Sequence, residues 1–507
     1  LRFHLTKILV AGALFVLTLS VAGCQGGELS DPEIAEAIER ELIYDPVVLA
    51  SDIYAQVEDG IVNLRGTTSN LLARDRTERI AETVKGVRSV VNEIDVEPDE
   101  ARSDEEIKNR VEEALYRDPA TDSYEISVNV LDGEVELTGT VESWAERDLS
   151  SAVAKGIKGV TEVDNRITVE PADVRNDLEI QREVERTLRW DVLVDHALIR
   201  VSVEGGTVFL RGAVGSAAEK RRARRDAFVT GAQIVDDSQL LVQRWARDEE
   251  FRQDKYADVS DEDIEEALRD AIERAPRLYE GDLTVTVQDG AATLEGSVPT
   301  LKALRTATDV AHSTVGVDQV VNRLIVEPVE PPSDEEIVED VQSSLEESPL
   351  VEAEDIQVSV VGGVATLAGS VETSFQRAYA EDIASMSRGA IEVQNDLAVK
   401  DDTAPLIYDP FVWRFDPREF SGYMAESYST DASDEVIRES VEQELFWSPF
   451  VDESDIVVTV EDGVVTLTGT VNTLREQADA IENAYEGGAI WVEEELVVTT
   501  LGGTPDG

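Results

Sequence analysis

Cysteine and histidine are almost absent from this chain of 507 residues, which contains one Cys and three His. The single cysteine, Cys24, leaves no partner for a disulfide bond within the chain. The histidines, His4, His196 and His312, lie far apart in the sequence and form neither a nucleophile–base pair nor a set of metal ligands. The residues therefore predict no catalytic site, no cofactor and no metal site, and we expect a protein that is not an enzyme.

Basic residues are also scarce. The chain has 45 Lys and Arg against 107 Asp and Glu, which gives a formal net charge of -62. Nucleic acid is excluded as a partner because its binding needs a basic surface. Carboxylates repel one another at low ionic strength, but at about 1 M salt the Debye length is only about 3 Å and this repulsion is screened. The composition favours a halophilic source; the alternative is that the acidic excess keeps a long repeat protein soluble.

A long apolar run is missing as well. The N-terminal segment "LRFHLTKILVAGALFVLTLSVAGCQGG" has a basic start and an apolar run over residues 8–19, which is short for a membrane span but typical of a secretory signal. The residues Val21–Cys24 resemble the lipobox of bacterial lipoproteins, in which the cysteine becomes the lipidated first residue. We therefore expect residues 1–23 to be a signal peptide and Cys24 to carry the lipid; the alternative is an ordinary signal peptide with a chance cysteine. Gln25 favours sorting to the outer membrane.

What the chain does contain is one motif written six times, as "VEDGIVNLRG" in the first copy and "VEDGVVTLTG" in the last. The leading glycines are separated by 73, 73, 84, 73 and 100 residues, so the chain is a tandem repeat. Apolar residues alternate on both sides of the first glycine, which predicts a β-hairpin whose turn needs a positive φ. We interpret both glycines of each copy as structural; the pairs are Gly60 and Gly66, Gly133 and Gly139, Gly206 and Gly212, Gly290 and Gly296, Gly363 and Gly369, and Gly463 and Gly469.

Helical patterns flank each hairpin. Upstream, an N-cap residue precedes a carboxylate by three positions, as in Ser103 and Glu106, and an apolar stripe follows until an Asp-Pro or Ser-Pro pair. The other predicted capping boxes are Ser30 with Glu33, Asn176 with Glu179, and Ser333 with Glu336. Downstream, a second helical stretch is closed by a glycine that we interpret as its C-cap, such as Gly86, and a last strand follows. Each unit is therefore predicted to be αββαβ, of the α+β class, with two helices covering one face of a three-stranded mixed sheet.

The patterns S-D-x-x-I, I-x-V-x-V-x-D-G-x-V-x-L-x-G-x-V and G-V-x-x-V-x-N-x-I-x-V resemble the BON domain of bacterial periplasmic and outer-membrane proteins. We expect six such units, named repeats 1 to 6, at residues 30–98, 103–171, 176–244, 260–328, 333–400 and 433–499. Repeats 2, 5 and 6 fit the pattern best, and repeats 3 and 4 are weaker matches. The resemblance implies the αββαβ fold, the lack of a catalytic centre, and a role in phospholipid or membrane attachment, envelope integrity and osmotic-stress protection.

Two features interrupt the uniform repeats. Repeat 3 has eleven basic and eleven acidic residues, whereas repeat 6 has two and seventeen. The basic residues include a cluster on the second helix of repeat 3, formed by Lys220, Arg221, Arg222, Arg224 and Arg225. This cluster can contact lipid phosphates or an acidic neighbouring repeat, or it is a solvated helix face; contact with an acidic repeat is favoured, because molar salt weakens attraction to headgroups.

The second interruption is an aromatic-rich insertion at residues 401–432, which includes Trp413 and Phe415. Aromatic rings contribute large buried areas, so we expect this insertion to dock on a domain face, a partner or a membrane interface. Residues 245–259 are expected to be a charged helical spacer, and residues 500–507 a tail.

Together these patterns predict a non-enzymatic, lipid-anchored, periplasmic protein of the cell envelope, attached to the outer membrane. Its repeats would form an extended arm that binds or scaffolds at the membrane, in envelope integrity or osmotic-stress protection of a salt-adapted bacterium. The expected partners are the membrane, phospholipid and envelope proteins. The alternatives are a direct phospholipid-binding or lipid-handling module, and a small-ligand or ion-binding protein of the osmotic-stress response.

Overall fold

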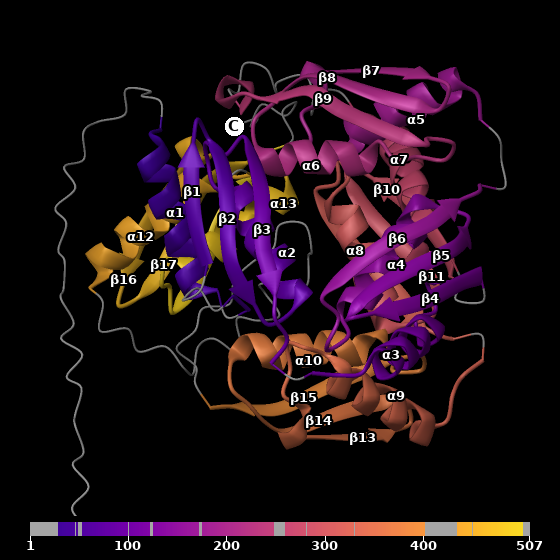
Figure 1. Cartoon of the computed structure of the whole chain (residues 1–507). Helices are drawn as coiled ribbons and strands as arrows, with labels where there is room; N and C mark the ends of the chain where they lie inside the picture. Colours follow the sequence, from indigo (N-terminus) through magenta and orange to yellow (C-terminus); the bar gives the residue numbers. More distant parts are fainter. Residues whose placement is uncertain are drawn as a thin grey trace, which may run out of the picture.

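The computed structural model describes residues 29–45, 47–48, 53–99, 101–121, 125–171, 175–247, 259–279, 281–328, 330–400, 433–448 and 450–499. Over these residues the chain forms six three-stranded sheets, each accompanied by two α-helices (Figure 1). The predicted α+β class with six αββαβ units is confirmed. Cys24, Trp413, Phe415, the signal segment, the aromatic insertion, the tail and most of the spacer lie outside the described residues.

The elements of the first three repeats have closely similar lengths. Repeat 1 comprises α1 (Asp31–Tyr44), β1 (Ile53–Glu58), β2 (Ile61–Thr68), α2 (Leu71–Thr83) and β3 (Ser89–Val96). Repeat 2 comprises α3 (Asp104–Arg117), β4 (Ile126–Leu131), β5 (Glu134–Val141), α4 (Trp144–Lys155) and β6 (Glu162–Val169). Repeat 3 comprises α5 (Asp177–Trp190), β7 (Ile199–Glu204), β8 (Thr207–Val214), α6 (Ala217–Asp226) and β9 (Ile234–Val242).

The last three repeats follow the same order. Repeat 4 comprises α7 (Asp261–Glu273), β10 (Asp282–Gln288), β11 (Ala291–Val298), α8 (Leu301–His312) and β12 (Gln319–Val326). Repeat 5 comprises α9 (Asp334–Glu347), β13 (Ile356–Val361), β14 (Val364–Val371), α10 (Ser374–Met386) and β15 (Glu392–Val399). Repeat 6 comprises α12 (Asp434–Trp447), β16 (Ile456–Glu461), β17 (Val464–Val471), α13 (Leu474–Glu486) and β18 (Trp491–Val498). Short 3-10 helices are η3 (His196–Leu198), η4 (Arg244–Arg247), η6 (Pro276–Leu278), η7 (Ala353–Asp355) and η8 (Glu453–Asp455).

The first helix of a repeat begins and ends where the sequence predicts. The four predicted capping boxes form. In α3 the backbone N–H of Ser103 donates to Glu106 Oε2 at 3.0 Å, and the N–H of Glu106 donates to Ser103 Oγ at 3.3 Å. These bonds satisfy N–H groups that have no partner within the helix. Helix α3 then stops at Arg117, directly before an Asp-Pro pair.

Each sheet places the second strand in the centre. In repeat 2, β4 pairs with β5 antiparallel and β5 pairs with β6 parallel, as the crossover through α4 predicts. The hairpin turn has φ of 52° at Asp132 and 81° at Gly133, so both central residues are left-handed, as in a primed turn.

The second glycine of the motif lies inside the strand and not at its end. In repeat 2, Gly139 pairs with Ile126, and a Cβ built on it would overlap the carbonyl oxygen of Glu125. The backbone directly before the first strand, and not a helix, therefore requires a glycine here.

The glycine after the second helix differs from the predicted C-cap. Helix α2 has its C-cap at Val84, whereas Gly86 follows two residues later with φ of 97°. A Cβ on Gly86 would lie 2.9 Å from Ile34 Cδ1, so this glycine permits close packing against α1. In repeat 6, Gly488 does directly follow the C-cap residue, Gly487.

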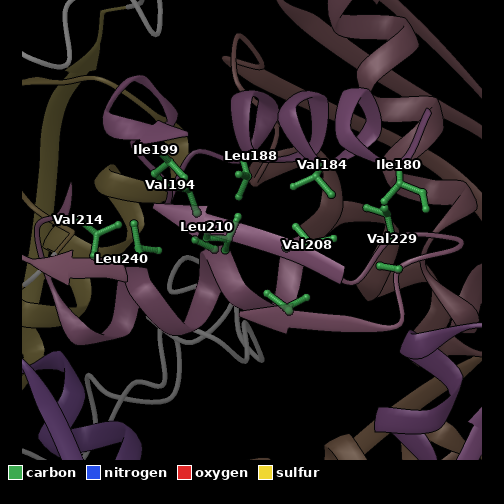
Figure 2. Close-up of a cluster of buried hydrophobic side chains, with 14 of the residues drawn as sticks. Ile180, Val184, Leu188, Val194, Ile199, Val208, Leu210, Val214, Val229 and Leu240 are labelled. Atoms are coloured by element: carbon green, nitrogen blue, oxygen red, sulfur yellow. The ribbon is translucent and has the colours of Figure 1, made fainter. Parts of the chain in front are cut away.

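The core of each repeat lies between its helices and its sheet. In repeat 3, Ile180, Val184 and Leu188 project from one side of α5 toward Val208 and Leu210 of β8 (Figure 2). These five side chains are at most 1% exposed. Burial of each such side chain stabilises the fold by roughly 1.5–3 kcal/mol. The other five repeats have buried clusters of the same kind, so every repeat has its own core.

The repeats pack in nested pairs, 1 with 6, 2 with 5 and 3 with 4. Lys85 Nζ donates to the carbonyl oxygen of Phe446 at 2.9 Å, which joins repeat 1 to repeat 6. The N–H of Lys158 donates to Glu347 O at 3.0 Å, which joins repeat 2 to repeat 5. A third bond joins repeats 4 and 3, from the N–H of Val315 to the oxygen of Trp190 at 2.9 Å. In each pair, the segment after a second helix contacts the end of a first helix.

A second set of contacts links repeats 1, 2 and 3 to one another. The first residue of each second helix reaches into another repeat. Leu71 of α2 joins the core of repeat 2, and Ala217 of α6 joins the core of repeat 1. Trp144 of α4 packs on Phe228 of repeat 3 with ring centroids 4.5 Å apart. These three contacts close a ring.

Repeats 4, 5 and 6 are linked in a related way. Leu474 of α13 packs against the core of repeat 4. Lys302 of α8 pairs with Asp382 of α10 at 2.6 Å.

The predicted extended arm is therefore wrong. Repeats at opposite ends of the chain, 1 and 6, are in direct contact, and the second helices point inward with sheets on the outside (Figure 1). The physical reason is that the second helices carry apolar and charged side chains that do not pack on the sheet of their own repeat. Other repeats cover these side chains.

Candidate functional site

The motif glycines belong to a clamp between the first helix and the hairpin turn. In repeat 3, Asp177 at the start of α5 accepts hydrogen bonds from the N–H groups of Gly205 at 2.8 Å and Gly206 at 3.0 Å. These two bonds hold the pKa of Asp177 below its usual value. The same pair of bonds forms in every repeat, with acceptors Asp31, Asp104, Asp177, Asp261, Asp334 and Asp434.

Sequence reasoning missed this clamp. The available signal was the Asp of S-D-x-x-I, which stands 29 residues before the turn glycine in every copy. From the sequence alone, this Asp is explained as a carboxylate that stabilises the first turn of the helix. Only the fold brings it to the hairpin. The clamp uses two backbone N–H groups of each turn internally, so the repeated motif serves to build the repeat.

The basic cluster of α6 lies mostly against acidic side chains. Arg221 pairs with Glu82 of α2 in repeat 1. Arg222 Nε and Nη2 each lie 2.5 Å from Asp191 Oδ2. Two further members approach Asp237 of the same repeat, with Arg224 Nη1 at 2.8 Å and Lys220 Nζ at 3.9 Å. Arg221 thus contacts an acidic residue of another repeat, one of the arrangements expected from the sequence. The fifth member, Arg225, lines a cavity between repeats 3 and 4.

The interface between repeats 1 and 6 contains several carboxyl groups. Burial and the neighbouring Glu41 raise the pKa of Glu444 to about 9, and the same two causes raise the pKa of Glu486 to about 8. Burial also raises the pKa of Glu41. Arg40 Nε lies 3.8 Å from Glu444 Oε1 and offsets part of the repulsion. Glu444 and Glu486 therefore hold protons near neutral pH, because burial and the neighbouring carboxylates disfavour their charged forms.

A cavity of about 610 Å³ lies among repeats 1, 2, 4 and 5. Basic and acidic side chains line it and form ion pairs with one another. Arg277 Nη2 lies 3.0 Å from Asp118 Oδ2, and Lys155 Nζ lies 2.6 Å from Asp75 Oδ2. The pairs link repeats 4 and 2 and repeats 2 and 1, so the charges of this cavity join repeats together.

Neither metal chemistry nor a membrane span is apparent in the part of the chain that the structure describes. Within these ranges, no three His, Cys, Asp or Glu side chains are grouped to hold a metal ion. Also within these ranges, no helix has both the length and the apolar character needed to cross a bilayer.

The fold and the interior contacts define a tandem α+β repeat protein whose units pack together through their helices. The sequence matches the family description of the BON domain at residues 30–98, 103–171, 176–242, 260–328, 333–401 and 433–489. The chain belongs to the BON domain family. The resemblance noted in the sequence is thereby confirmed.

Two curated proteins are similar to parts of the chain. It is 26% identical over 146 residues to osmotically-inducible protein Y of Escherichia coli (strain K12), a match that covers 28% of this chain and 73% of that protein. It is 32% identical over 138 residues to outer membrane lipoprotein DolP of Haemophilus influenzae, covering 26% of this chain and 71% of that protein.

A solved structure of CdsD, a structural protein of the type III secretion system of Chlamydia trachomatis, matches with 16% identity. The match covers 40% of this chain and 88% of that chain, with a TM-score of 0.12, which is too low to support an argument.

Proposed function

We propose that this chain is a non-enzymatic, lipid-anchored protein of the cell envelope whose BON domains form a scaffold at the outer membrane, in envelope integrity or osmotic-stress protection. Support comes from the two similar proteins, one named for osmotic induction and one an outer membrane lipoprotein. The lipobox-like residues before Cys24 support the anchor, and the charge of -62 supports a salt-adapted source.

The observation that carries the scaffold proposal is the contact between the first and last repeats, Lys85 with Phe446. It makes the repeats one body in which the helices pack inward, so that partners meet the outward sheet faces and the loops (Figure 1). This body favours a scaffold over a direct phospholipid-binding module. The basic side chains of α6 that a headgroup would need are mostly paired with carboxylates.

The experiment uses the full chain expressed in a Gram-negative host and labelled with a fatty-acid probe. We expect label on the wild type and on Gln25→Asp, and none on Cys24→Ser. Gln25→Asp serves as the matched control, because it keeps the cysteine and alters only the proposed sorting residue. Label on Cys24→Ser would overturn the anchor.

A flotation assay separates a scaffold from a lipid-binding module. Purified protein that lacks residues 1–24, and therefore has neither the signal segment nor the anchor, is mixed with phosphatidylglycerol vesicles at low and at molar salt. A scaffold that is held at the membrane only by its lipid anchor then stays at the bottom of the gradient under both conditions. Flotation at low salt that disappears at molar salt would instead support direct, electrostatic binding of phospholipid and contradict the scaffold.

A further inference from the structure

A cavity of about 450 Å³ lies between the helices of repeats 3 and 4, which pack side by side (Figure 1). Helices α5 and α6 form one wall, α7 and α8 form another, and Arg475 of α13 reaches in from repeat 6. Five basic side chains line this space, namely Arg222, Arg225, Arg274, Lys302 and Arg475. Such a concentration is unexpected in a chain with a net charge of -62.

Three of these basic residues are neutralised by carboxylates. Arg222 pairs with Asp191 at 2.5 Å, Lys302 with Asp382 at 2.6 Å, and Arg475 with Asp479 at 3.0 Å. Within the described residues, the guanidinium groups of the other two, Arg225 and Arg274, make neither a hydrogen bond nor an ion pair, although the buried Asp226 attracts Arg274. Arg225 is exposed, whereas Arg274 is half-buried.

Two further carboxyl groups line the cavity, those of Asp226 and Asp309. Burial raises the pKa of Asp309 to about 8, and it raises the pKa of Asp226 well above its usual value. A protonated carboxyl group is a hydrogen-bond donor and carries no charge. With Asp309 protonated near neutral pH, the five basic side chains outnumber the carboxylates that face or pair with them, even when Asp226, which lies 3.6 Å from Arg222, is counted as charged. Burial lowers the pKa of Arg274, and attraction to Asp226 offsets part of this effect.

We propose that this cavity binds a small oxyanion of the phosphate or phosphomonoester class between Arg225 and Arg274. A guanidinium group presents paired N–H donors that match two oxygens of such an anion. The cavity lies between two repeats, so a bound anion stabilises the pairing of repeats 3 and 4. A membrane surface does not fit a space of this volume between helices, whereas a soluble anion does.

The test titrates inorganic phosphate into the full chain at pH 7, with potassium chloride adjusted to hold the ionic strength constant. We expect a saturable heat of binding and a rise in the unfolding midpoint, because a ligand that binds the folded state stabilises it. Arg274→Gln and Arg225→Gln should each weaken binding about tenfold or more, which corresponds to about 1.4 kcal/mol. Arg274→Lys should retain part of the affinity.

The matched control is Arg224→Gln, on the same helix as Arg225 but paired with Asp237 and not lining the cavity. It should bind phosphate like the wild type. If Arg274→Gln does not fold, Arg225→Gln carries the test, because this exposed side chain contributes little to packing.

Three results would overturn the proposal. One is equal phosphate binding by the double variant Arg225→Gln/Arg274→Gln, which means an adventitious ion only. Another is the same stabilisation by chloride alone, which means general screening. The third is no binding of phosphate combined with flotation on phosphatidylglycerol vesicles that depends on Arg274, which assigns the two arginines to a lipid headgroup.

Discussion

The carboxylate of Asp434 lies 2.9 Å from the backbone nitrogen of Gly463 and accepts its hydrogen bond, although 29 residues separate the two in the chain. A second bond, from the N–H of Asp462, is 3.0 Å long. The first residue of α12 therefore fixes the turn of the hairpin β16–β17 directly. Helix and hairpin are connected by hydrogen bonds to a charged acceptor as well as by the apolar core.

Replacement of this acceptor should destabilise repeat 6. We expect Asp434→Ala to lower the free energy of unfolding by roughly 1–3 kcal/mol, because two N–H groups lose a charged acceptor. Denaturant unfolding followed by circular dichroism measures the loss. Glu435→Ala is the matched control, since Glu435 is exposed in the same helical turn and is expected to change stability by less than about 0.5 kcal/mol. Equal effects of the two substitutions would show that the helix dipole, and not the clamp, is responsible.

The contact between repeats 1 and 6 should weaken as the pH rises. The pKa values of Glu444, about 9, and Glu486, about 8, lie above the unfolded value of about 4.3. Their contribution to stability is complete below the unfolded value and is lost as the pH rises through 8 to 9. Hydrogen exchange should therefore show less protection in α1 and α12 at pH 9 than at pH 6.

A substitution identifies the groups responsible for this pH dependence. Glu444→Gln should flatten it, because the amide stays neutral across the range. Glu439→Gln, on the same helix but 61% exposed, should leave it unchanged. If Glu444→Gln kept the full pH dependence, the general repulsion of the acidic chain would be its cause.

The sequence predicts the interior of a repeat well, because its signals are local. The capping box at Ser103 and the hairpin at Gly133 each depend on residues within a few positions of one another. The second glycine shows the limit of such reasoning. Gly139 stands at the end of a motif in the sequence, yet a glycine is required there because the carbonyl oxygen of Glu125, directly before the adjacent strand, approaches closely.

The arrangement of the repeats could not be predicted in this way. Glu444 and Arg274 look like ordinary solvated charges on amphipathic helices, and only the packing of one repeat on another buries them. In the sequence, Trp144 likewise looks like an ordinary apolar residue at the start of a helix, and only the structure shows that its ring packs on Phe228. Contacts between repeats combine side chains that are unrelated in the sequence, and the local pattern of one repeat does not show which residues of another complete its core, as Leu71 does for repeat 2.

The nested pairing predicts a compact particle in solution. A compact chain of about 480 residues has a radius of gyration of about 23 Å, and small-angle X-ray scattering on the protein lacking residues 1–24 should give a value near this. Arg277→Glu should increase the radius, since it places a second acid beside Asp118 between repeats 4 and 2. Arg323→Glu is the control, because Arg323 pairs with Glu295 within one repeat. A radius expected for separate, extended repeats in the unsubstituted protein would contradict the pairing.

Salt should stabilise the protein. The charge of -62 repels itself within a compact body, and this repulsion is screened between about 0.05 and 2 M salt. Ion pairs between repeats, such as Lys302 with Asp382, are weakened by salt but are only slightly exposed. We expect the midpoint of thermal unfolding to rise across this range, as measured by calorimetry. A constant midpoint would remove the argument for a salt-adapted protein.

The two glycines of the last motif should act through folding. Gly463 has φ of 78°, and a Cβ on it would lie 2.5 Å from Ile490 Cδ1, so Gly463→Val combines strain of roughly 1–3 kcal/mol with a clash. A Cβ on Gly469 would overlap the oxygen of Asp455. Both valine variants should lose hydrogen-exchange protection over residues 433–499. Thr470→Val, an exposed β-branched substitution in the same strand, should not.

The nested pairing determines where the damage spreads. Repeat 1 should lose protection next, because Lys85 donates to Phe446 and Trp447 packs on the core of repeat 1. Repeats 2 and 5 should stay protected, since they are held by their own contact between Lys158 and Glu347. Damage that passed from repeat 6 to repeat 5 and spared repeat 1 would contradict the pairing. If both valine variants kept full protection and the protein lost its attachment to membranes or partners, the glycines would instead be a recognition feature.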